Sequence, residues 1–279
     1  MLDKNIYKIL CILYIQFFYI ILNVLYKKCN KLNKLKYLVK QNGENYYKYN
    51  RKYIKRIKKV VYSILFGNYD KISSFVKQKD YNYFLFSDIN YNNTNWTIIP
   101  FSKLKKKKIS KIKMTRYIKL FPNLFFKDYE LSIYFDASFI INGDLNELLL
   151  RALNPSFDIY LLQHPERNKV FQEFSAVIKY KKDKKRIVNQ VKKRYKKTKF
   201  PDKLILTENC IIIRRHNNKN MIKLMTAWWN EIKKYSYRDQ LSLNYVIWKL
   251  NLKIKIYYLS KQFMLEYFIK RNHTKRIKY

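Results

Sequence analysis

The chain has 279 residues, enough for one sizeable α/β domain with a buried core or for two small ones, and we expect one. Its 60 Lys and Arg residues against 19 Asp and Glu residues give a formal net charge of +41. Only three cysteines occur, with no C-x-x-C pair and no metal-ligand spacing, which argues against a disulfide framework and against a zinc site.

The high positive charge has two explanations. Basic clusters neutralise phosphates and release counterions, which favours nucleic acid or an anionic surface as a partner. The lysines, however, come with many Asn, Ile and Tyr residues, which are encoded by A/T-rich codons, so a genome-wide base bias would give the same composition. We favour the second explanation because the lysines are spread along the chain and no nucleic-acid-binding motif is present. We therefore expect no specific nucleic-acid partner, and a basic nucleic-acid-binding protein is the alternative.

The N-terminal segment is a candidate membrane anchor. Residues 9–26 carry no charge and are flanked by lysines on both sides. This run of 18 residues is just long enough to span a bilayer. No small-residue cleavage site follows it, so we expect a retained anchor over residues 1–28, in a single-pass membrane protein, and not a cleaved signal peptide.

The orientation of this anchor stays open. The lysines between residues 27 and 36 favour a cytosolic position for the rest of the chain. Three glycosylation sequons, which begin at Asn92, Asn95 and Asn272, favour a lumenal position, although a chain rich in Asn forms such sequons by chance.

The rest of the chain divides by composition. Residues 29–57 are rich in Lys, Asn and Tyr without clear periodicity, and we interpret them as a basic stem. We expect the folded domain over residues 58–265 and a basic tail over residues 266–279. The domain contains no internal repeat and no glycine-rich phosphate-binding loop.

Three apolar runs predict the first strands, over residues 60–66, 83–86 and 96–100. The first run ends in the turn sequence Gly67-Asn68-Tyr69-Asp70, and the second ends at Asp88. Ligands bind at the carboxyl ends of strands in open α/β sheets. For each aspartate taken singly, however, a turn-forming role is the commoner explanation.

The stretch from residue 131 to residue 143 places another carboxylate at a strand end. Residues 133–135 predict a buried strand that stops at Asp136, and no packing role explains a carboxylate there. A second short strand is predicted over residues 139–141, followed by a turn and then by a helix start with capping-box spacing at Asp144 and Glu147. We expect these last two residues to be helix caps.

A basic helix is predicted before this strand, over residues 104–120. It carries Arg116 and Lys119 one turn apart, and the simpler explanation of both is a solvated helix face.

The second half of the chain alternates strands and amphipathic helices. Strands are predicted over residues 157–162 and 210–213 and at the edge over 253–259, and helices from about residue 168 and over 221–232 and 241–250. Glu208 precedes the second of these strands, and Arg238-Asp239 precede the last helix. The pattern Ser236-x-x-Asp239 also fits a capping box, which is an equal alternative to catalysis for Asp239.

Taken in order, these motifs resemble the TOD/MUCI glycosyltransferase-like family. They are VVYSILFGNYDKI at 60–72, YFLFSD at 83–88, Arg116-x-x-Lys119 with Pro122, YFDASFIINGDL at 134–145, HPER with Glu173, ENCIIIRRHN at 208–217 and RDQLSLNYV at 238–246. The resemblance spans residues 58–250. It implies an A-type nucleotide-sugar glycosyltransferase fold, a Rossmann-like mixed sheet flanked by helices, which moves a hexosyl or pentosyl group from a nucleotide-diphosphate sugar to a glycan, protein or lipid acceptor. Plant members are Golgi membrane proteins, which implies an ER or Golgi location if the source is eukaryotic.

The resemblance also implies where the donor binds. It places Asp136 at a metal site, where Mn²⁺ or Mg²⁺ neutralises the leaving diphosphate. Ser138 stands where a second acid is expected, so that Arg116 and Lys119 supply part of the positive charge. The residues that we expect to bind the nucleotide sugar are Gly67, Asn68, Tyr69, Asp70, Asp88, Arg116, Lys119, Asp136, Ser138 and Arg238.

An inverting transfer would also need a general base on the acceptor side. We expect this base to be Asp239, held ionised by Arg238, with Glu208 and Glu173 as the reserve candidates.

A ceramidase-like hydrolase is the alternative, because some family members are described as ceramidases. Amide hydrolysis would use an activated water, typically on a metal with histidine ligands. The histidines His164, His216 and His273 lie in three separate segments without H-x-x-H spacing, so we favour transfer.

Overall fold

The structure is a computed structural model that describes residues 50–67, 70–104, 109–152 and 157–272. The chain divides into two compact units, residues 1–53 and 54–279, and the sheet and its helices belong to the second. The predicted anchor and nearly all of the predicted stem lie outside the described residues, as do Asn68 and Tyr69. Among the described helices, none combines the length and the apolar character that crossing a bilayer would require.

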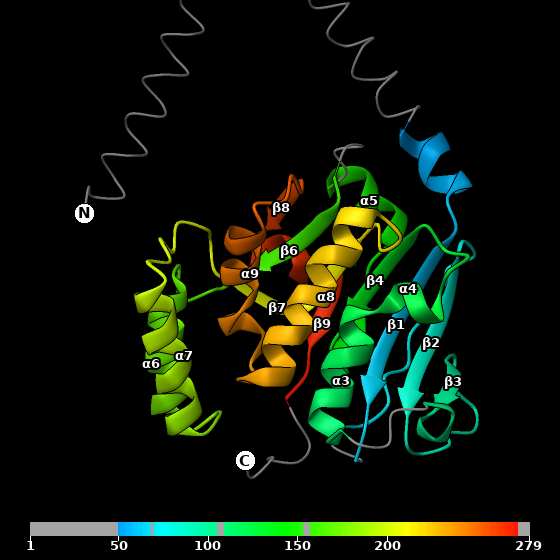
Figure 1. Cartoon of the computed structure of the whole chain (residues 1–279). Coiled ribbons are helices and arrows are strands. Elements are labelled where there is room, and N and C mark those ends of the chain that lie inside the picture. The colour runs from blue at the N-terminus through cyan, green and yellow to red at the C-terminus, as the bar shows by residue number, and fades with distance from the viewer. Residues whose placement is uncertain (1–49, 68–69, 105–108, 153–156, 273–279) are drawn as a thin grey trace, which may run out of the picture. The chain divides into compact units, whose positions relative to one another are not determined.

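The second unit is built on a mixed sheet of seven strands in the order β3-β2-β1-β4-β7-β6-β8 (Figure 1). The strands are β1 (Lys59–Leu65), β2 (Tyr81–Ser87), β3 (Thr97–Pro100), β4 (Leu131–Phe135), β6 (Ile159–Gln163), β7 (Thr207–Arg214) and β8 (Ile256–Leu259). Strands β3, β2, β1 and β4 run parallel, whereas β7 is antiparallel to both of its neighbours. The expected mixed α/β sheet is thus confirmed, with β8 at its edge as predicted.

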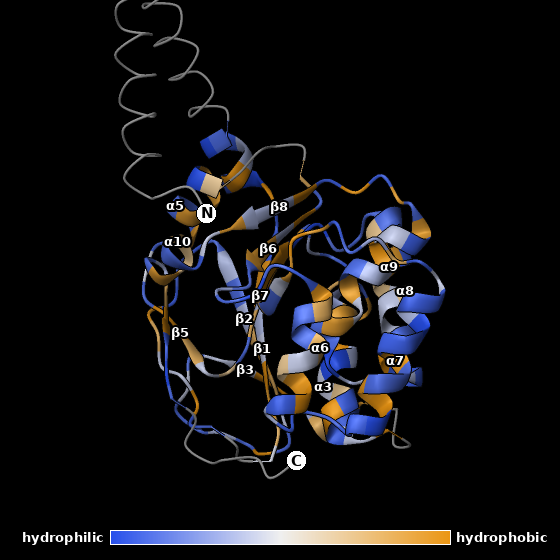
Figure 2. Ribbon diagram, turned by 90° about the vertical axis from the view of Figure 1, so that its left-hand side faces the viewer, coloured by the Kyte–Doolittle hydropathy of each residue, from blue (hydrophilic) through white to orange (hydrophobic). Residues whose placement is uncertain are grey.

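Strand β1 lies at the centre of the parallel half. All seven of its residues are buried, which is why its sequence, KVVYSIL, is mostly apolar and does not alternate. Figure 2 shows the reason, because both faces of the sheet are covered: α3, α6, α7, α8 and α9 lie on one face, and β5, α5 and α10 lie on the other.

The helices and the remaining short elements connect these strands. They are η1 (Phe101–Lys103), α3 (Lys111–Leu120), α4 (Pro122–Phe125), β5 (Phe139–Ile141), α5 (Leu145–Ala152), α6 (Val170–Lys179), α7 (Lys185–Lys197), α8 (Lys219–Lys234), η2 (Asp239–Leu241), α9 (Leu243–Leu250), α10 (Lys261–Leu265) and β9 (Phe268–Lys270).

Helix α8 places its apolar stripe in the core, as its 3.6-residue spacing predicts, and its Trp229 ring meets Tyr117 of α3 with ring centroids 5.2 Å apart. This contact joins the two helices on the same face of the sheet.

Two helices differ from the sequence-based prediction. Helix α3 begins at Lys111 and not near residue 104, because the Ser110 side chain caps it by accepting a hydrogen bond from the Lys113 backbone at 3.4 Å. The helix predicted from about residue 168 is two helices and not one. The chain leaves α6 through Lys181, whose φ of +50° is left-handed, and α7 starts four residues later.

The start of α5 confirms one of its two predicted caps. The Asp144 carboxylate accepts hydrogen bonds from the backbone of Asn146 at 2.7 Å and of Glu147 at 3.3 Å. The Glu147 side chain instead lies 3.8 Å from Arg151 one turn later. It therefore stabilises the helix as an i,i+4 pair.

A second, two-stranded sheet joins β5 to β9, which lies beyond the domain end that we expected at residue 265. Next to it, the backbone amides of Asn142 and Gly143 both donate to the carbonyl of Tyr267, at 2.8 and 3.2 Å. Because Gly143 has no side chain, the two backbones can approach this closely.

Replacing Gly143 with alanine should therefore destabilise the fold. The new Cβ would lie 2.8 Å from Tyr267 Cδ1 and 3.0 Å from both the Glu266 carbonyl oxygen and Tyr267 Cα, so backbone must move. We expect a loss of about 1–3 kcal/mol in the free energy of unfolding, measured by denaturant titration.

Gly67 provides the matched control. Its Cβ would meet nothing within 4 Å, but its φ is +76°. Gly67→Asn should then cost less than Gly67→Ala, because asparagine tolerates this conformation, whereas Gly143→Asn should cost at least as much as Gly143→Ala. Equal stability of Gly143→Ala and the unsubstituted chain would contradict the close approach.

Candidate functional site

The first pocket lies where the strand order reverses. Strands β2 and β3 extend the sheet on one side of β1, and β4 lies on its other side. In open α/β sheets the crevice at such a switch point is the usual ligand site. A cavity of about 280 Å³ occurs here, lined by residues 64–66 at the carboxyl end of β1, residues 136–138 after β4, and Asp70, Arg116 and Arg238. We call it the switch-point pocket.

Asp136 is held in this pocket by its own strand end. Its backbone amide donates to the Cys210 carbonyl at 2.8 Å, and the Tyr134 hydroxyl donates to its Oδ1. Within the described residues, no Lys, Arg or His lies at ion-pair distance from its carboxylate. The buried Ser138 lines the same pocket. The sequence-predicted residues Asp70, Arg116, Asp136, Ser138 and Arg238 are therefore brought together.

Asp88 occupies a different position. Its carboxylate accepts hydrogen bonds from the Gly67 amide at 2.9 and 3.1 Å and pairs with Lys111 Nζ at 2.7 Å. Burial alone would raise the pKa of Asp88, but these contacts hold it below its ordinary value. Neither Asp88 nor Gly67 is among the described residues that line the switch-point pocket. These contacts connect Asp88 to Gly67, just after β1, and to the first residue of α3.

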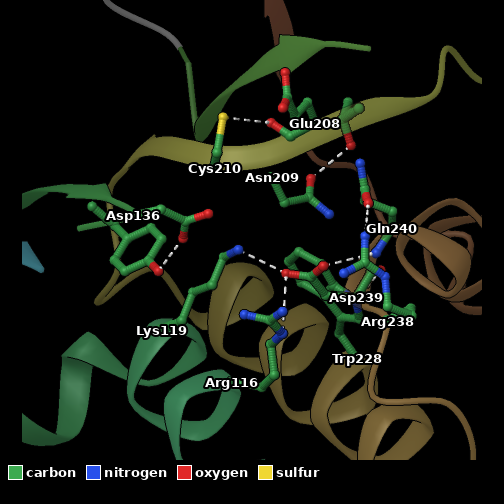
Figure 3. A network of polar contacts seen from close by, with 12 residues as sticks. Arg116, Lys119, Asp136, Glu208, Asn209, Cys210, Trp228, Arg238, Asp239 and Gln240 are labelled. Atoms are coloured by element: carbon green, nitrogen blue, oxygen red, sulfur yellow. Dashed lines mark hydrogen bonds and ion pairs between the residues drawn. The ribbon is translucent and has the colours of Figure 1, made fainter. Parts of the chain in front are cut away.

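A second cavity of about 430 Å³ adjoins the first and shares Arg116, Asp136 and Arg238 with it. Most of its wall is polar, with Lys119 from α3, Glu208 and Asn209 from β7, and Asp239 and Gln240 from η2. We call it the polar pocket. Figure 3 shows these side chains converging from α3, β7 and η2.

A buried ion pair forms one wall of the polar pocket. Lys119 Nζ lies 2.7 Å from Asp239 Oδ2, with side-chain exposures of 2% and 6%, and Arg116 Nε lies 3.8 Å from the same oxygen. Burial would raise the pKa of Asp239, but the charges of Lys119 and Arg116 lower it well below its ordinary range. The carboxylate is therefore ionised and bound at neutral pH.

A buried guanidinium holds the backbone of Lys119 in place. Arg214 of β7 is fully buried and donates to the Lys119 carbonyl oxygen and to the Tyr62 hydroxyl. That hydroxyl donates to the same carbonyl at 2.8 Å. The last turn of α3 is thus hydrogen-bonded to side chains of β1 and β7, an arrangement that the sequence patterns did not predict.

The capping-box alternative for Asp239 is wrong. The Ser236 hydroxyl donates to Asp183 at 2.6 Å and accepts from the Arg238 amide at 3.1 Å, whereas α9 begins only at Leu243. Asp239 starts a short 3₁₀ turn, and its Oδ2 faces Lys119 and not a helix terminus.

The two reserve carboxylates also line the polar pocket. Glu173 has only 1% of its side chain exposed and pairs with Arg167 at 2.6 Å. Glu208 has 22% exposed and lies 3.5 Å from Lys270 Nζ of β9. Glu208 is therefore the more accessible of the two to a bound molecule.

The two described histidines lie apart. His164 lines the polar pocket, and its Nδ1 accepts hydrogen bonds from the backbone of Glu166 and Arg167 at 3.1 Å each. His216 is buried elsewhere, with Nε2 2.9 Å from the Phe126 carbonyl oxygen. His273 lies outside the described residues. The described part of the chain holds no group of three or more His, Cys, Asp or Glu residues placed to bind a metal.

Burial of His216 predicts a pH dependence of stability. Burial lowers its pKa to about 4, against about 6.5 when unfolded. Between these values the unfolded chain binds a proton that the folded chain does not, so stability falls as pH falls from 6.5 to 4. We expect the melting temperature to drop over this window and the drop to be shallower in His216→Gln. Equal slopes for the two proteins would contradict this role.

Comparisons with known proteins give three results. A search of curated proteins found no match. Two solved structures are similar at low scores: apo WbbM bifunctional glycosyltransferase, with 13% identity and a TM-score of 0.44 over 73% of this chain, and apo mouse xyloside xylosyltransferase 1, with 9% identity and a TM-score of 0.41 over 71% of this chain. The matches span 39% and 84% of those proteins, respectively.

The sequence profile of one family matches residues 95–275, which include β3 to β9 and all of the polar pocket. The chain belongs to the family described as TOD1/MUCI70, glycosyltransferase-like domain.

Proposed function

We propose that the chain is a glycosyltransferase that binds a nucleotide-diphosphate sugar in the switch-point pocket and its acceptor in the polar pocket. The observation that carries this proposal is the carboxylate of Asp136. It ends a central parallel strand at the switch point, has no described cationic partner within ion-pair distance, and lines both pockets. A group in that position can meet the diphosphate of the donor and face the acceptor as well.

The residues around Asp136 fit a divalent cation whose remaining coordination positions the phosphates of the substrate would fill. Mg²⁺ is commonly held by one or two carboxylates together with phosphate oxygens. Asp136 and Asp70 both line the switch-point pocket, and Asp136 has no competing cation at ion-pair distance among the described residues. When bound, such a cation would neutralise the leaving diphosphate. Arg116 and Arg238, which line both pockets, would add further positive charge.

For an inverting reaction we propose Glu208 as the base in place of Asp239. A base must accept a proton, and the Lys119–Asp239 pair opposes protonation because it lowers the pKa of Asp239. Glu208 lines the same pocket, is partly exposed, and has only a long 3.5 Å contact to Lys270. Asp239 then acts by holding Lys119 and Arg116 in place.

The membrane anchor over residues 1–28 and an ER or Golgi location in a eukaryotic cell remain part of this proposal on the sequence pattern alone. An anchored enzyme would act on an acceptor that passes near the membrane surface.

The proposal predicts nucleoside diphosphate binding that depends on Asp136. Calorimetry of the full chain with UDP, GDP and CDP, each with Mn²⁺ or Mg²⁺, should give heat with at least one of them. Asp136→Asn should weaken that binding at least about tenfold, equivalent to about 1.4 kcal/mol. Asp144→Asn removes the same charge from a helix cap outside both pockets and should bind normally, since asparagine is also a good cap. No heat with any nucleotide would refute the donor site.

The two carboxylates of the polar pocket should behave differently. Glu208→Gln should lower kcat about 10²–10⁴-fold at an unchanged melting temperature, as expected for a base. Asp239→Asn should lower the melting temperature, because it leaves Lys119 buried and unpaired, at a cost of about 3–5 kcal/mol.

The measurement is release of nucleoside diphosphate from a nucleotide sugar that the unsubstituted enzyme turns over. Unchanged kcat in Glu208→Gln, or a product with retained anomeric configuration by NMR, would contradict the base assignment.

A further inference from the structure

The polar pocket contains positive charge that its own carboxylates do not neutralise. Four of its carboxylates are already paired: Asp239 with Lys119, Glu166 and Glu173 with Arg167, and Glu208 with Lys270. Lys182, Arg238 and Lys261 also line the pocket, and none of them makes an ion pair with a described carboxylate. The fifth carboxylate, Asp136, lies on the side shared with the switch-point pocket.

Lys182 and Arg238 lie on two segments that a hydrogen bond connects. The Tyr237 hydroxyl donates to the Lys182 carbonyl oxygen at 2.6 Å, which joins the turn between α6 and α7 to the segment before η2. Lys182 is partly buried. Burial lowers its pKa most, and the charge of Arg238 lowers it further. Two cations are thus held near each other with no described carboxylate paired to either, an arrangement that favours a bound anion.

The side-chain amide of Asn209 gives a second indication of a bound ligand, and this indication does not depend on the charges. Its side chain lines the polar pocket and the residue is only 2% exposed. Its Oδ1 accepts a hydrogen bond from the Thr207 hydroxyl at 2.7 Å, but its Nδ2 has no described hydrogen-bond partner. Figure 3 shows the amide extending from β7 toward the side on which Lys119 and Asp239 lie. A buried donor without a partner destabilises the folded chain, and a hydrogen bond to a ligand in the pocket would offset that cost.

The groups that remain for a ligand are therefore mainly donors. Lys182 and Arg238 offer only N–H groups, and the unpaired atom of Asn209 is an N–H₂ group. A neutral sugar presents hydroxyls, which need acceptors as well as donors. A carboxylate or phosphate group presents only acceptors, and charge-assisted hydrogen bonds to such groups are the strong ones.

We propose that the polar pocket takes an acceptor that bears a negatively charged group, a carboxylate or a phosphate ester, which Lys182, Arg238 and the amide of Asn209 bind. This inference rests on the proposed function, in which the polar pocket holds the acceptor. It names the chemical class of that acceptor, an acidic saccharide or saccharide phosphate, and identifies Asn209 and Lys182 as residues that select it.

The test compares three probes of similar size: glucose, glucuronate and glucose 6-phosphate. Each is titrated into the full chain by NMR or calorimetry with saturating nucleoside diphosphate and Mn²⁺ or Mg²⁺, so that the switch-point pocket is filled. At least one of the two anions should bind at least about tenfold more tightly than glucose, with an affinity that falls as salt rises. Which anion binds better separates a carboxylate from a phosphate ester.

Lys182→Gln and its control Lys179→Gln make the test specific. Both lysines lie over the Tyr180 ring, at 5.6 and 5.7 Å from its centroid, but only Lys182 lines the pocket. Lys182→Gln should weaken anion binding about tenfold and leave glucose binding unchanged, whereas Lys179→Gln should leave both unchanged. Asn209→Asp, which keeps the side-chain shape and adds a negative charge, should weaken anion binding as well.

The proposal is overturned if neither anion binds more tightly than glucose, or if Lys179→Gln weakens the anion as much as Lys182→Gln does, which would indicate general surface charge. It is also overturned if the nucleoside diphosphate displaces the anion, because the cations would then belong to the donor site. These outcomes are distinguishable from failure of the proposed function, which is read from nucleotide binding in the same preparation.

Discussion

The buried ion pair between Lys119 and Asp239 is the interaction on which the candidate site depends. It connects the last turn of α3 to η2, and so joins a helix that packs on the parallel half of the sheet to the segment that leads into α9. Arg214 and Tyr62 hold the carbonyl of Lys119 from inside the sheet. A buried pair stabilises little when compared with apolar packing, but removing one partner is costly. The pair therefore fixes one geometry of the site more than it adds to stability.

Three carboxylates of the candidate site, one of them in this pair, differ in environment, and the difference separates their proposed roles. Asp239 is buried between cations, Glu208 is partly exposed with one long contact to a lysine, and Asp136 has no described cation at ion-pair distance. A carboxylate already neutralised by cations of the protein suits a structural role, whereas a carboxylate without a described cationic partner suits a bound cation or a substrate. The distinction is made by cationic neighbours from α3 and β9 and not by the residue type.

The sequence predicted most strands of the sheet and the position of Asp136, because both depend on local pattern. Fully buried strands such as β4 are mostly apolar runs, and a carboxylate at the end of such a run is visible in the sequence. The break between α6 and α7 was not predicted, because it depends on a left-handed turn at Lys181, a residue without turn preference. The partners of Asp88 and Asp239 could not be predicted either, because they lie far away in the sequence. Lys111, for example, lies 23 residues from Asp88, and Lys119 lies 120 residues from Asp239.

The central claim is that a nucleoside diphosphate and its cation bind at the carboxyl ends of β1 and β4. A crystal structure of the full chain with Mn²⁺ and the nucleoside diphosphate that it binds, with anomalous data collected for manganese, tests this most directly. We expect one anomalous peak in contact with both the Asp136 carboxylate and the diphosphate oxygens, inside the switch-point pocket. A diphosphate and manganese bound elsewhere, or a diphosphate in the polar pocket between Lys182 and Arg238, would contradict it.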